Sequence, residues 1–336
     1  MKESFLPKDY KSVLNLYETQ TAIGMIHTVF EKELSEELNL KRVSAPLIVD
    51  PNTGLNDDLN GVERPVKFDI KFSGGEAVVV HSLAKWKRMA LDRYGFKPGE
   101  GLFTDMNAIR RDEDLDNLHS VYVDQWDWEK VITKEQRNKD FLKETVKRIV
   151  RAIYDTQNEL VKAFPSLTPS VKSLDVSFIT SQELEDMFPS LTPKQREDAY
   201  VKDHPTTFIM QIGDKLKSGE RHDGRAPDYD DWSLNGDILF YDEVLDMAIE
   251  ISSMGIRVDS KSLDYQLNEA NANDRRKYPF HKALLNNELP LTIGGGIGQS
   301  RLSMFLLGKA HIGEVQSSIW DQKTKDVFSK AGIVLL

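Results

Sequence analysis

The sequence contains no cysteine in its 336 residues. This absence excludes disulfide bonds, thiolate metal sites and a cysteine nucleophile, and a reducing cytoplasm is the expected location. Long hydrophobic runs are also missing, so we expect no membrane span and no membrane partner. The first residues, MKESFLPKDYKS, lack the apolar centre of a cleaved leader sequence, so no leader is expected.

The sequence also lacks an excess of basic residues. The chain has 44 Lys and Arg against 54 Asp and Glu, a formal net charge of −10. Proteins that bind nucleic acid regardless of sequence carry a basic surface, so nucleic acid is not an expected partner. No linker or low-complexity stretch divides the chain, and we expect one domain over residues 1–336 with a substantial core.

Hydrophobic periodicity predicts helices and strands in a mixed order. Apolar residues spaced three and four apart predict helices over residues 18–40 and 136–164, with a shorter one over 82–94. Strict alternation over 66–72, followed by EAVVV, predicts a hairpin. RVSAPLIV (42–49) is expected to be an extended edge segment interrupted by Pro46. Further strands are expected over 102–109, 121–129, 208–212, 237–241 and 250–258. Consecutive antiparallel strands with helices around them predict an α+β fold.

Turn signals divide the second half of the chain. The hexapeptide FPSLTP occurs at 164–169 and 188–193, where each copy is expected to end a helix. Thr180 and Thr192 are each followed by Glu or Gln three residues later, the pattern of a capped helix start. The polar stretch 214–236 is expected to form a loop over a site.

The segment VYVDQWDWE (121–129) alternates in polarity. In a strand, Gln125, Asp127 and Glu129 share one face and the two tryptophans lie on the other. This is either an ordinary strand with its polar face in water or a row of acceptors for an amine or a cation.

Two charged segments precede that strand. IRRDED (109–114) is either a solvated charge run or an arginine fork for a phosphate. In HSLAKWKR (81–88), Ser82 is placed to cap a helix. Lys85 and Lys87 are two residues apart and cannot share a helical face. One is therefore expected to point inward toward an anion, and the other to lie on the surface.

Two later segments carry carboxylates. RAPDYDDWSLNGD (225–237) has four acids, which fit either a metal or ammonium site or an acidic loop. EISSMGIR (250–257) begins with a carboxylate and ends with a guanidinium. Glu250 could bind Mg²⁺ and Arg257 a substrate carboxylate, or the two could form cross-strand ion pairs.

Four glycines lie within five residues of LTIGGGIGQSRLSMF (291–305). The run matches neither the phosphate loop nor the dinucleotide fingerprint. Glycines allow a backbone to approach a ligand closely, and a following helix offers free N–H groups. The alternative is a tight connection between a strand and a helix.

The order of these segments resembles motifs 1, 2 and 3 of class II aminoacyl-tRNA synthetases, in the aspartyl and asparaginyl branch. The chain is too short to carry an anticodon-binding domain as well. HSLAKWKR, LHSVYVDQWDWE, RAPDYDDW, LNGDIL, EISSMGIRV and TIGGGIGQSRL are more similar to the ammonia-dependent asparagine synthetases, the aspartate–ammonia ligases of AsnA type. Ser300 replaces the glutamate that synthetases have before the motif 3 arginine, as in that ligase family. Arg111 departs from it, since the family commonly has proline there.

The resemblance implies an α+β fold like a class II synthetase catalytic core, and a ligase reaction. The aspartate β-carboxylate attacks the α-phosphate of ATP, giving β-aspartyl-AMP and pyrophosphate, and ammonia then displaces AMP. Without cysteine the chain cannot carry a cysteine-dependent glutaminase, so free ammonia is the expected nitrogen source and no glutaminase subunit is required. The superfamily also implies a homodimer, formed through the motif 1 helix and strand.

The resemblance also assigns the nucleotide and metal sites. Arg110 corresponds to the arginine that clamps the α-phosphate, with Arg111 as its competitor, and Arg301 to the one that stacks on adenine. The remaining nucleotide residues implied are Ser253 and Gly296. The residues implied for Mg²⁺ are Asp237 and Glu250.

Aspartate and ammonia have their own implied residues. Arg257 is expected to hold the side-chain carboxylate of aspartate, and Asp57, or its neighbour Asp58, to take a proton from ammonium. The other residues implied for aspartate are Ser82, Lys87, Gln125, Asp127 and Asp230.

Two other functions fit the same residues less well. A free-standing synthetase-like enzyme would transfer aspartate to a tRNA or protein without ammonia. A catalytically inactive sensor would bind amino acid or nucleotide but would not need the full set of arginines, lysine and carboxylates.

Overall fold

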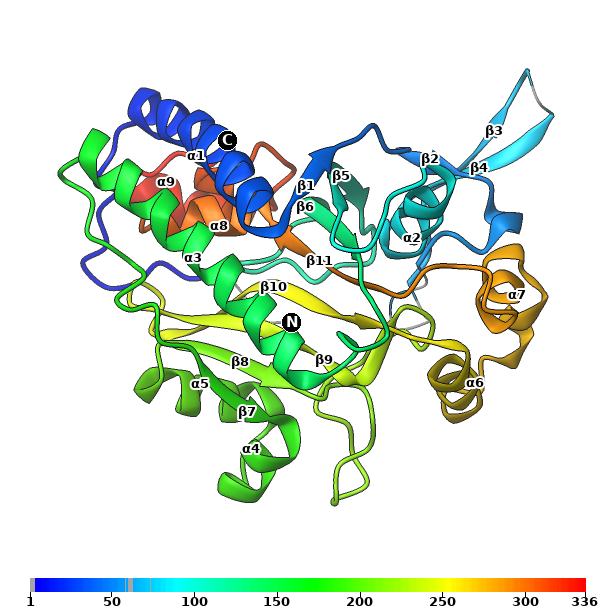
Figure 1. The fold of residues 1–336 in the computed structure, drawn as a ribbon. Helices are drawn as coiled ribbons and strands as arrows, with labels where there is room; N and C mark the ends of the chain where they lie inside the picture. The colour runs from blue at the N-terminus through cyan, green and yellow to red at the C-terminus, as the bar shows by residue number, and fades with distance from the viewer. Residues whose placement is uncertain (1–3, 58, 60–62, 73) are drawn as a thin grey trace.

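The computed structural model describes residues 4–57, 59, 63–72 and 74–336. Within them, eight strands form one sheet whose central pairs are antiparallel, and only the outer pairs β1–β5 and β7–β8 are parallel (Figure 1). The expected α+β fold with a mainly antiparallel sheet is confirmed. In spatial order the strands are β1 (Leu40–Arg42), β5 (Gly101–Ile109), β6 (Tyr122–Val131), β11 (Thr292–Gly298), β10 (Met247–Arg257), β9 (Asp230–Asp242), β8 (Thr206–Met210) and β7 (Ser177–Thr180).

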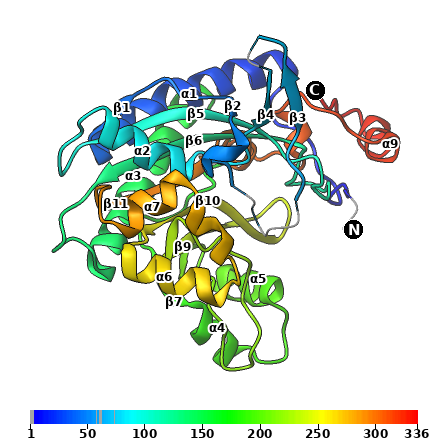
Figure 2. The ribbon, with the colours of Figure 1, turned by 90° about the vertical axis from the view of Figure 1, so that its right-hand side faces the viewer.

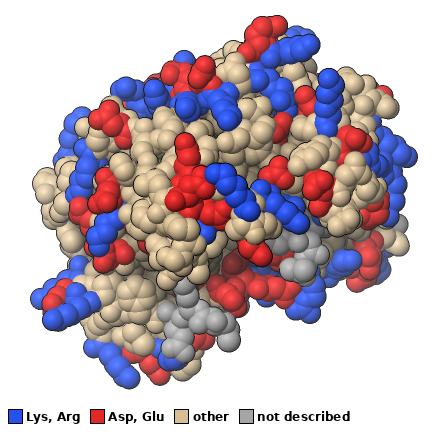
Figure 3. Space-filling view, turned by 90° about the horizontal axis from the view of Figure 1, so that it is seen from below, with Lys and Arg blue, Asp and Glu red and all other residues tan. Residues whose placement is uncertain are grey.

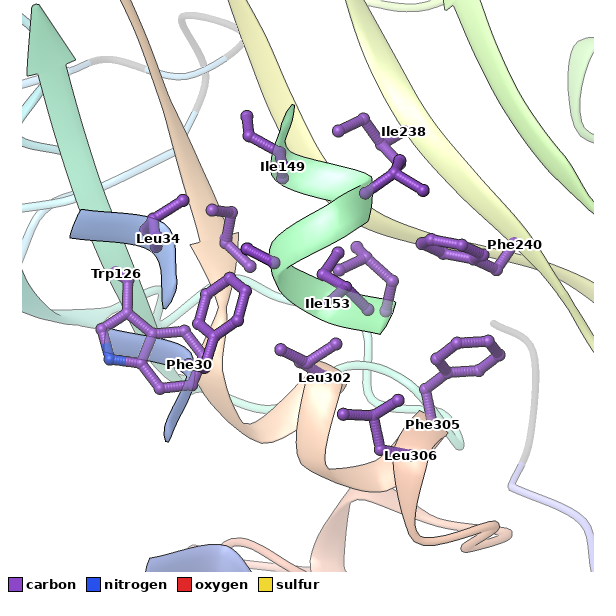
Figure 4. Packing of buried hydrophobic residues seen from close by; sticks show 14 of the residues in the cluster. Phe30, Leu34, Trp126, Ile149, Ile153, Ile238, Phe240, Leu302, Phe305 and Leu306 are labelled. Atoms are coloured by element: carbon purple, nitrogen blue, oxygen red, sulfur yellow. The ribbon is translucent and has the colours of Figure 1, made fainter. Parts of the chain in front are cut away.

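Three helices cover one face of this sheet and enclose the main core. The side chains of Phe30, Trp126 and Phe305 point into the same space in Figure 4, and the Phe30 and Trp126 ring centroids are 4.7 Å apart. Each such buried side chain contributes about 1.5–3 kcal/mol to stability. Among the described residues, no helix is long and apolar enough to span a membrane. The three helices are α1 (Leu16–Leu38), α3 (Lys139–Ala163) and α8 (Gln299–Leu306).

The opposite face is covered only in part, by two groups of helices. One group packs on β7, β9 and β10 through a small apolar cluster. The other lies at the side of the sheet that faces the viewer in Figure 2. The area between the two groups is where the candidate site lies. The first group is α4 (Ser181–Met187) and α5 (Pro193–Asp203), and the second is α2 (Ala84–Arg93), α6 (Ser260–Glu269) and α7 (Pro279–Leu285).

A small sheet of order β2–β4–β3 stands apart from the main one, and the predicted hairpin is its projecting part (Figure 1). The segment 42–49, expected to be an extended edge segment interrupted by Pro46, is interrupted there: β1 ends at Arg42 at the edge of the main sheet, and β2 begins at Ile48 at the edge of the small one. The small sheet comprises β2 (Ile48–Val49), β3 (Lys67–Ile70) and β4 (Gly75–Val79).

The helix ends predicted at the FPSLTP copies and the helix starts predicted after Thr180 and Thr192 are confirmed, and the three predicted helices end within a few residues of the observed bounds, but the predicted long loop is not confirmed. Each FPSLTP copy follows a helix, and Thr180 and Thr192 both form capping boxes. The expected loop over 214–236 is wrong in its second part, because β9 begins at Asp230 and pairs with β10. The remaining elements are α9 (Gln322–Lys330) and the 3₁₀ turns η1 (Pro51–Thr53), η2 (Asn273–Lys277) and η3 (Ile312–Glu314).

Candidate active site

A cavity of about 410 Å³ opens over the partly covered face of β6, β11 and β10. It brings together residues far apart in the sequence, which is what a binding site in a sheet protein requires. The sequence-predicted residues that line it are Arg110, Gln125, Glu250, Ser253, Gly296 and Arg301.

The glycine run forms β11, which lies along the floor of this cavity between β6 and β10. A Cβ atom at Gly294 would lie 2.0 Å from Glu129 Oε2, and one at Gly296 would lie 2.3 Å from Gln125 Oε1. Both distances are far below van der Waals contact. The glycines at these two positions therefore make room for the polar side chains of β6, which cross over the strand on the cavity side.

We expect Gly294→Ala to lower activity by at least tenfold, because the added methyl group displaces the Glu129 carboxylate and the groups bonded to it. Steady-state kinetics and thermal unfolding would measure the effect. Gly24→Ala in α1 is the matched control, since a Cβ there meets nothing within 4 Å. That control should be neutral or stabilising by about 0.5–1 kcal/mol. Equal behaviour of the two variants would contradict this role of Gly294.

Directly after the glycines, α8 places Arg301 at the cavity wall. Its Nη1 donates to the backbone carbonyl of Glu250 at 2.9 Å, which holds the guanidinium across β10. Asp124 caps the same helix from β6 by accepting the Ser300 N–H at 3.0 Å, and the Ser300 hydroxyl donates to it as well. The predicted transition from strand to helix is confirmed.

A buried charge cluster lies on the same face of the sheet as the cavity, farther along β6 and β11, and is formed by Lys87, Asp127, Glu129, Asp230 and Arg257. Arg257 Nε and Nη2 bond both Glu129 oxygens, at 3.0 and 2.8 Å, and its Nη1 donates to Asp230. Lys87 Nζ lies 3.2 Å from Asp127 and donates to the carbonyls of two strand residues. Four of these five residues were predicted to bind aspartate, and the fifth, Glu129, pairs with Arg257 and lies 4.0 Å from Lys87.

In this cluster, burial and ion pairing have opposite effects on the pKa values of the charged groups. Burial lowers the pKa of Lys87, although Asp127 and Glu129 partly offset it. Burial would raise the pKa of Glu129, but the Arg257 guanidinium outweighs it and the pKa lies below its usual range. Burial raises the pKa of Asp230 despite its bond to Arg257. The cluster does not line the cavity in this structure, so a bound carboxylate must compete with Glu129 and Asp230 for Arg257.

The prediction that one of the two α2 lysines lies on the surface is wrong. Lys85 is buried and its Nζ lies 3.1 Å from Asp228, while Lys87 is buried on the other side of the helix. Asp228 also accepts from Arg275 and pairs with His281. Both lysines are buried because α2 lies between the sheet and the segment that contains η2 and α7. These cations hold the pKa of Asp228 well below its usual range against the effect of burial.

Asp57 lies next to the start of α2, and its carboxyl group is buried. Its Oδ1 accepts the Leu59 N–H at 2.9 Å, whereas its Oδ2 is buried without a hydrogen-bond partner among the described residues. Burial raises the pKa of Asp57. Ser82 is not the helix cap as predicted: Leu83 holds that position, and the Ser82 hydroxyl accepts the Ala84 N–H instead. The competing Asp58 lies outside the described residues.

The two predicted metal ligands share one sheet face because of a bulge. The register shifts between Glu250 and Ser252, so Glu250 pairs with Leu239 while Ser253 pairs with Asp237. Leu239 and Asp237 are two residues apart on β9, so Glu250 comes to lie on the face of Asp237. Burial raises the pKa of Asp237 to about 8, and Glu250 adds to this shift.

These two carboxylates fit a magnesium ion in donor type and number. Magnesium in nucleotide enzymes commonly takes one or two carboxylates together with phosphate oxygens and water. Asp237 Oδ1 is buried without a partner among the described residues, so one oxygen remains available. The described residues contain no group of three or more His, Asp or Glu placed to hold a metal, so phosphate and water would complete the coordination.

Arg225 was missed by the sequence reasoning, which noted only the acids of its segment. It lines the cavity, and its guanidinium bonds Asp237, twelve residues later, and Asp223. The signal that could have found Arg225 was the acid-rich pattern around it, because buried carboxylates require a cation as a partner. Arg110 also lines the cavity, with its Nε buried, while Arg111 is exposed. The geometry therefore favours Arg110 over Arg111 as the cavity arginine.

Comparison with known proteins places these features in a family. The family model for aspartate–ammonia ligase (AsnA) matches residues 17–332. The chain is 61% identical to the aspartate–ammonia ligase of Ruminiclostridium cellulolyticum, covering 100% of both chains, and 59% identical to that of Clostridium perfringens, covering 96% of each.

A solved structure shares the fold at much lower identity. The asparaginyl-tRNA synthetase of Pyrococcus horikoshii, complexed with asparaginyl-adenylate, matches with a TM-score of 0.65 and 14% identity, over 89% of this chain and 68% of that one. The fold is therefore that of class II aminoacyl-tRNA synthetases, as the order of motifs predicted.

Proposed function

The chain belongs to the aspartate–ammonia ligase family, and from this we propose how its cavity makes asparagine from aspartate, ATP and ammonia. The reaction passes through β-aspartyl-AMP and releases AMP and pyrophosphate. The observation that carries the proposal is the cavity itself, where Arg110, Gln125 and Arg301 lie around a glycine strand, with a buried charge cluster farther along the same face. Arginines suit a nucleotide, and the cluster suits an amino acid with three charged groups.

Activation of the carboxylate requires positioning rather than a protein nucleophile. We assign Arg110 to the α-phosphate and Arg301 to the adenine ring, with Ser253 and Gly296 against the nucleotide. An oxygen of the aspartate β-carboxylate bonds to phosphorus, and the bond from phosphorus to the β-phosphate oxygen breaks. The charge that develops on the phosphate is stabilised by the guanidinium of Arg110 in the cavity wall.

The buried charge cluster is assigned to aspartate. Arg257 holds the side-chain carboxylate, exchanging part of its contact with Glu129 and Asp230 for the substrate, and Lys87 holds a second carboxylate. Gln125, Asp127 and Asp230 surround the ammonium group of the substrate, and Ser82 lies at the start of the same helix as Lys87. The alternation of acids and cations suits a molecule that carries both signs of charge.

Ammonia attack forms a carbon–nitrogen bond, breaks the bond to AMP and leaves a proton to be removed. We assign this proton to Asp57, because its Oδ2 is buried without a partner among the described residues and its pKa is raised by burial. At neutral pH most ammonia is in the ammonium form, so a carboxylate that takes the proton of ammonium has a clear purpose.

We expect Asp57→Asn to separate the two half-reactions. Asparagine formation should fall about a hundredfold, while aspartate-dependent exchange of pyrophosphate into ATP should persist. Asp58→Asn is the matched control and should leave both rates near the wild-type values. Loss of exchange in Asp57→Asn would contradict its assignment to the second step.

The raised pKa of Asp57 gives a pH test with a definite sign. The ionised form is the base, so activity should rise with pH as Asp57 loses its proton. The acid limb of kcat should therefore lie above the usual range of an aspartate and be absent from the residual activity of Asp57→Asn. A limb at the ordinary aspartate pKa would contradict the assignment.

A bound Mg²⁺ would be held by Asp237 and Glu250, and it would neutralise charge on the phosphates. The chain alone supplies the face on which both carboxylates lie, through the bulge in β10. We also propose that the whole chain works as one catalytic domain in the cytoplasm, where ATP, aspartate and ammonium are available, without a glutaminase subunit. On the face shown in Figure 3 acidic and basic side chains are interspersed, which agrees with a small-molecule enzyme rather than one that binds nucleic acid.

We further propose a homodimer formed through α1 and the segment after it. Apolar side chains at the start of this helix are exposed, with Tyr17 at 84% and Leu16 at 47%. Exposed aromatic residues beside a long helix are typical of interfaces. Sedimentation equilibrium should give twice the mass of one chain, and Tyr17→Glu should lower it. A monomer at micromolar concentration would contradict the proposal.

Isotope transfer tests the proposed intermediate directly. With ¹⁸O in the β-carboxylate of aspartate, one labelled oxygen should appear in the AMP released for each asparagine formed. Mass spectrometry of AMP gives the result. Unlabelled AMP, or label in inorganic phosphate, would show that β-aspartyl-AMP is not formed.

A further inference from the structure

The described part of the cavity lining contains three arginines, and the reaction proposed above uses only two of them. Arg110 follows the end of β5, and Arg301 lies on α8 across β10. The third, Arg225, comes from the loop before β9. In the sequence, only the acids of this segment suggested a binding site. ATP carries about four negative charges, so a cavity that binds it needs cations along the whole triphosphate.

Arg225 is held differently from Arg257, a buried arginine on the same sheet face. Arg257 forms a complete side-on fork with Glu129 and also bonds Asp230, and it does not line the cavity. Arg225 meets Asp237 through Nη2 alone. Its Nε is buried without a hydrogen-bond partner among the described residues, and so is Asp237 Oδ1. One nitrogen of Arg225 and one oxygen of Asp237 form this ion pair. Each side chain therefore has a further atom that can bond a ligand.

The contacts of Arg225 Nη1 are also easily exchanged, and one of them is a 3.2 Å bond to the carbonyl of exposed Gly224. Arg225 Nη1 also lies 3.2 Å from Asp223, whose side chain is 58% exposed, whereas the Arg225 side chain is 11% exposed. An exposed ion pair contributes little, about 0–1 kcal/mol. A phosphate oxygen could replace Asp223 without breaking a buried contact.

The sheet order places Arg225 at the end of the cavity away from Arg110. Arg110 directly follows β5, whereas Asp237, which holds Arg225, is on β9, and β6, β11 and β10 lie between them. Strands are about 4.8 Å apart, so a chain of phosphates that begins at Arg110 extends toward β9. Glu250 and Asp237 lie at the same end, on the face shared through the bulge.

We propose that Arg225 binds the β- and γ-phosphates of ATP and stabilises the departing pyrophosphate. This inference rests on the proposed function, since it assigns a further residue to the same reaction. When the carboxylate oxygen bonds to the α-phosphorus, the electron pair of the broken bond remains on pyrophosphate. The guanidinium of Arg225 faces that developing charge, as Arg110 faces the charge on the α-phosphate.

The test compares ligands that differ only in these phosphates. Calorimetric titration of the full chain with ATP, pyrophosphate and AMP, at one fixed magnesium concentration, would be made for wild type, Arg225→Ala and Arg225→Lys. Arg221→Ala is the matched control: it removes an arginine from the same loop that lies over Trp232 and does not line the cavity. Arg225→Ala should weaken ATP and pyrophosphate about 10- to 100-fold and AMP less than twofold.

Each result of these titrations either supports or overturns the assignment of Arg225. Arg225→Lys keeps a charge but loses the planar fork, so it should show the same selectivity with a smaller loss, and it serves if the alanine variant does not fold. Equal weakening of ATP and AMP, or no change in either, would overturn the inference. If wild type bound neither nucleotide, the proposed function itself would fail. Arg221→Ala should bind all three ligands like wild type.

Discussion

Arg110→Ala should lower kcat about 10²- to 10³-fold, the largest loss of rate that we expect from a single replacement. The reason is that its guanidinium is assigned to charge that develops only in the transition state, and such a contact is worth about 3–4 kcal/mol. Arg110 is suited to this because it lines the cavity and its Nε is buried. Aspartate-dependent pyrophosphate exchange would measure the first step alone, and it should fall by the same factor.

Arg111→Ala is the control for this prediction. It removes the same side chain from the adjacent position, where the residue is exposed and does not line the cavity. Activity should remain within twofold of wild type. If the two variants exchanged their effects, the assignment of the phosphate arginine would be reversed.

Arg257→Met should affect stability and aspartate binding together. Removing the guanidinium leaves Glu129 and Asp230 buried without their cation, and breaking a buried pair in this way costs about 3–5 kcal/mol. The KM for aspartate should also rise by at least tenfold, because the variant has no group to hold the side-chain carboxylate. Urea unfolding and kinetics at saturating ATP would measure the two effects.

Arg196→Met separates stability from binding. Arg196 is buried on α5 and pairs with Glu185, away from the cavity. Its replacement should destabilise the protein but leave the KM for aspartate unchanged. An unchanged KM in Arg257→Met as well would show that the buried charge cluster is structural and that aspartate binds elsewhere.

The parts of the fold that the sequence predicted are those with strong periodicity. The 121–129 segment was assigned to the correct faces because a strand with one apolar side alternates strictly. Gln125 lies in the cavity, Asp127 and Glu129 lie in the cluster, and Trp126 and Trp128 are fully buried in the core. The predicted ends of the long helices lie within a few residues of the observed ends, because caps or turns mark them.

The errors arose where tertiary contacts supply what the local sequence lacks. The start of β9 was read as a loop because Asp230 and Asp231 are unfavourable in a buried strand. Arg257 and Arg137, both distant in sequence, supply the compensating charges. One of the two α2 lysines was expected on the surface because the sequence near it shows no second anion; the partner of Lys85, Asp228, is 143 residues away.

The glycine run has a different role from the one its composition suggests. Neither of the common phosphate loops explains it, since Gly294 and Gly296 are required by the side chains of Glu129 and Gln125. No local pattern indicates this requirement. It depends on the register between β11 and β6, which brings Gly294 opposite Glu129 and Gly296 opposite Asp127. The arginine at the end of the run, by contrast, was correctly expected at the start of a helix.

The most direct test of the account is the identity of the nucleotide released. With ATP, aspartate and ammonium, the enzyme should form AMP, pyrophosphate and asparagine in equal amounts, and net AMP release should stop when either aspartate or ammonium is omitted. Glutamine should not replace ammonium. Formation of ADP and phosphate, or of AMP at the same rate without ammonium, would contradict the account.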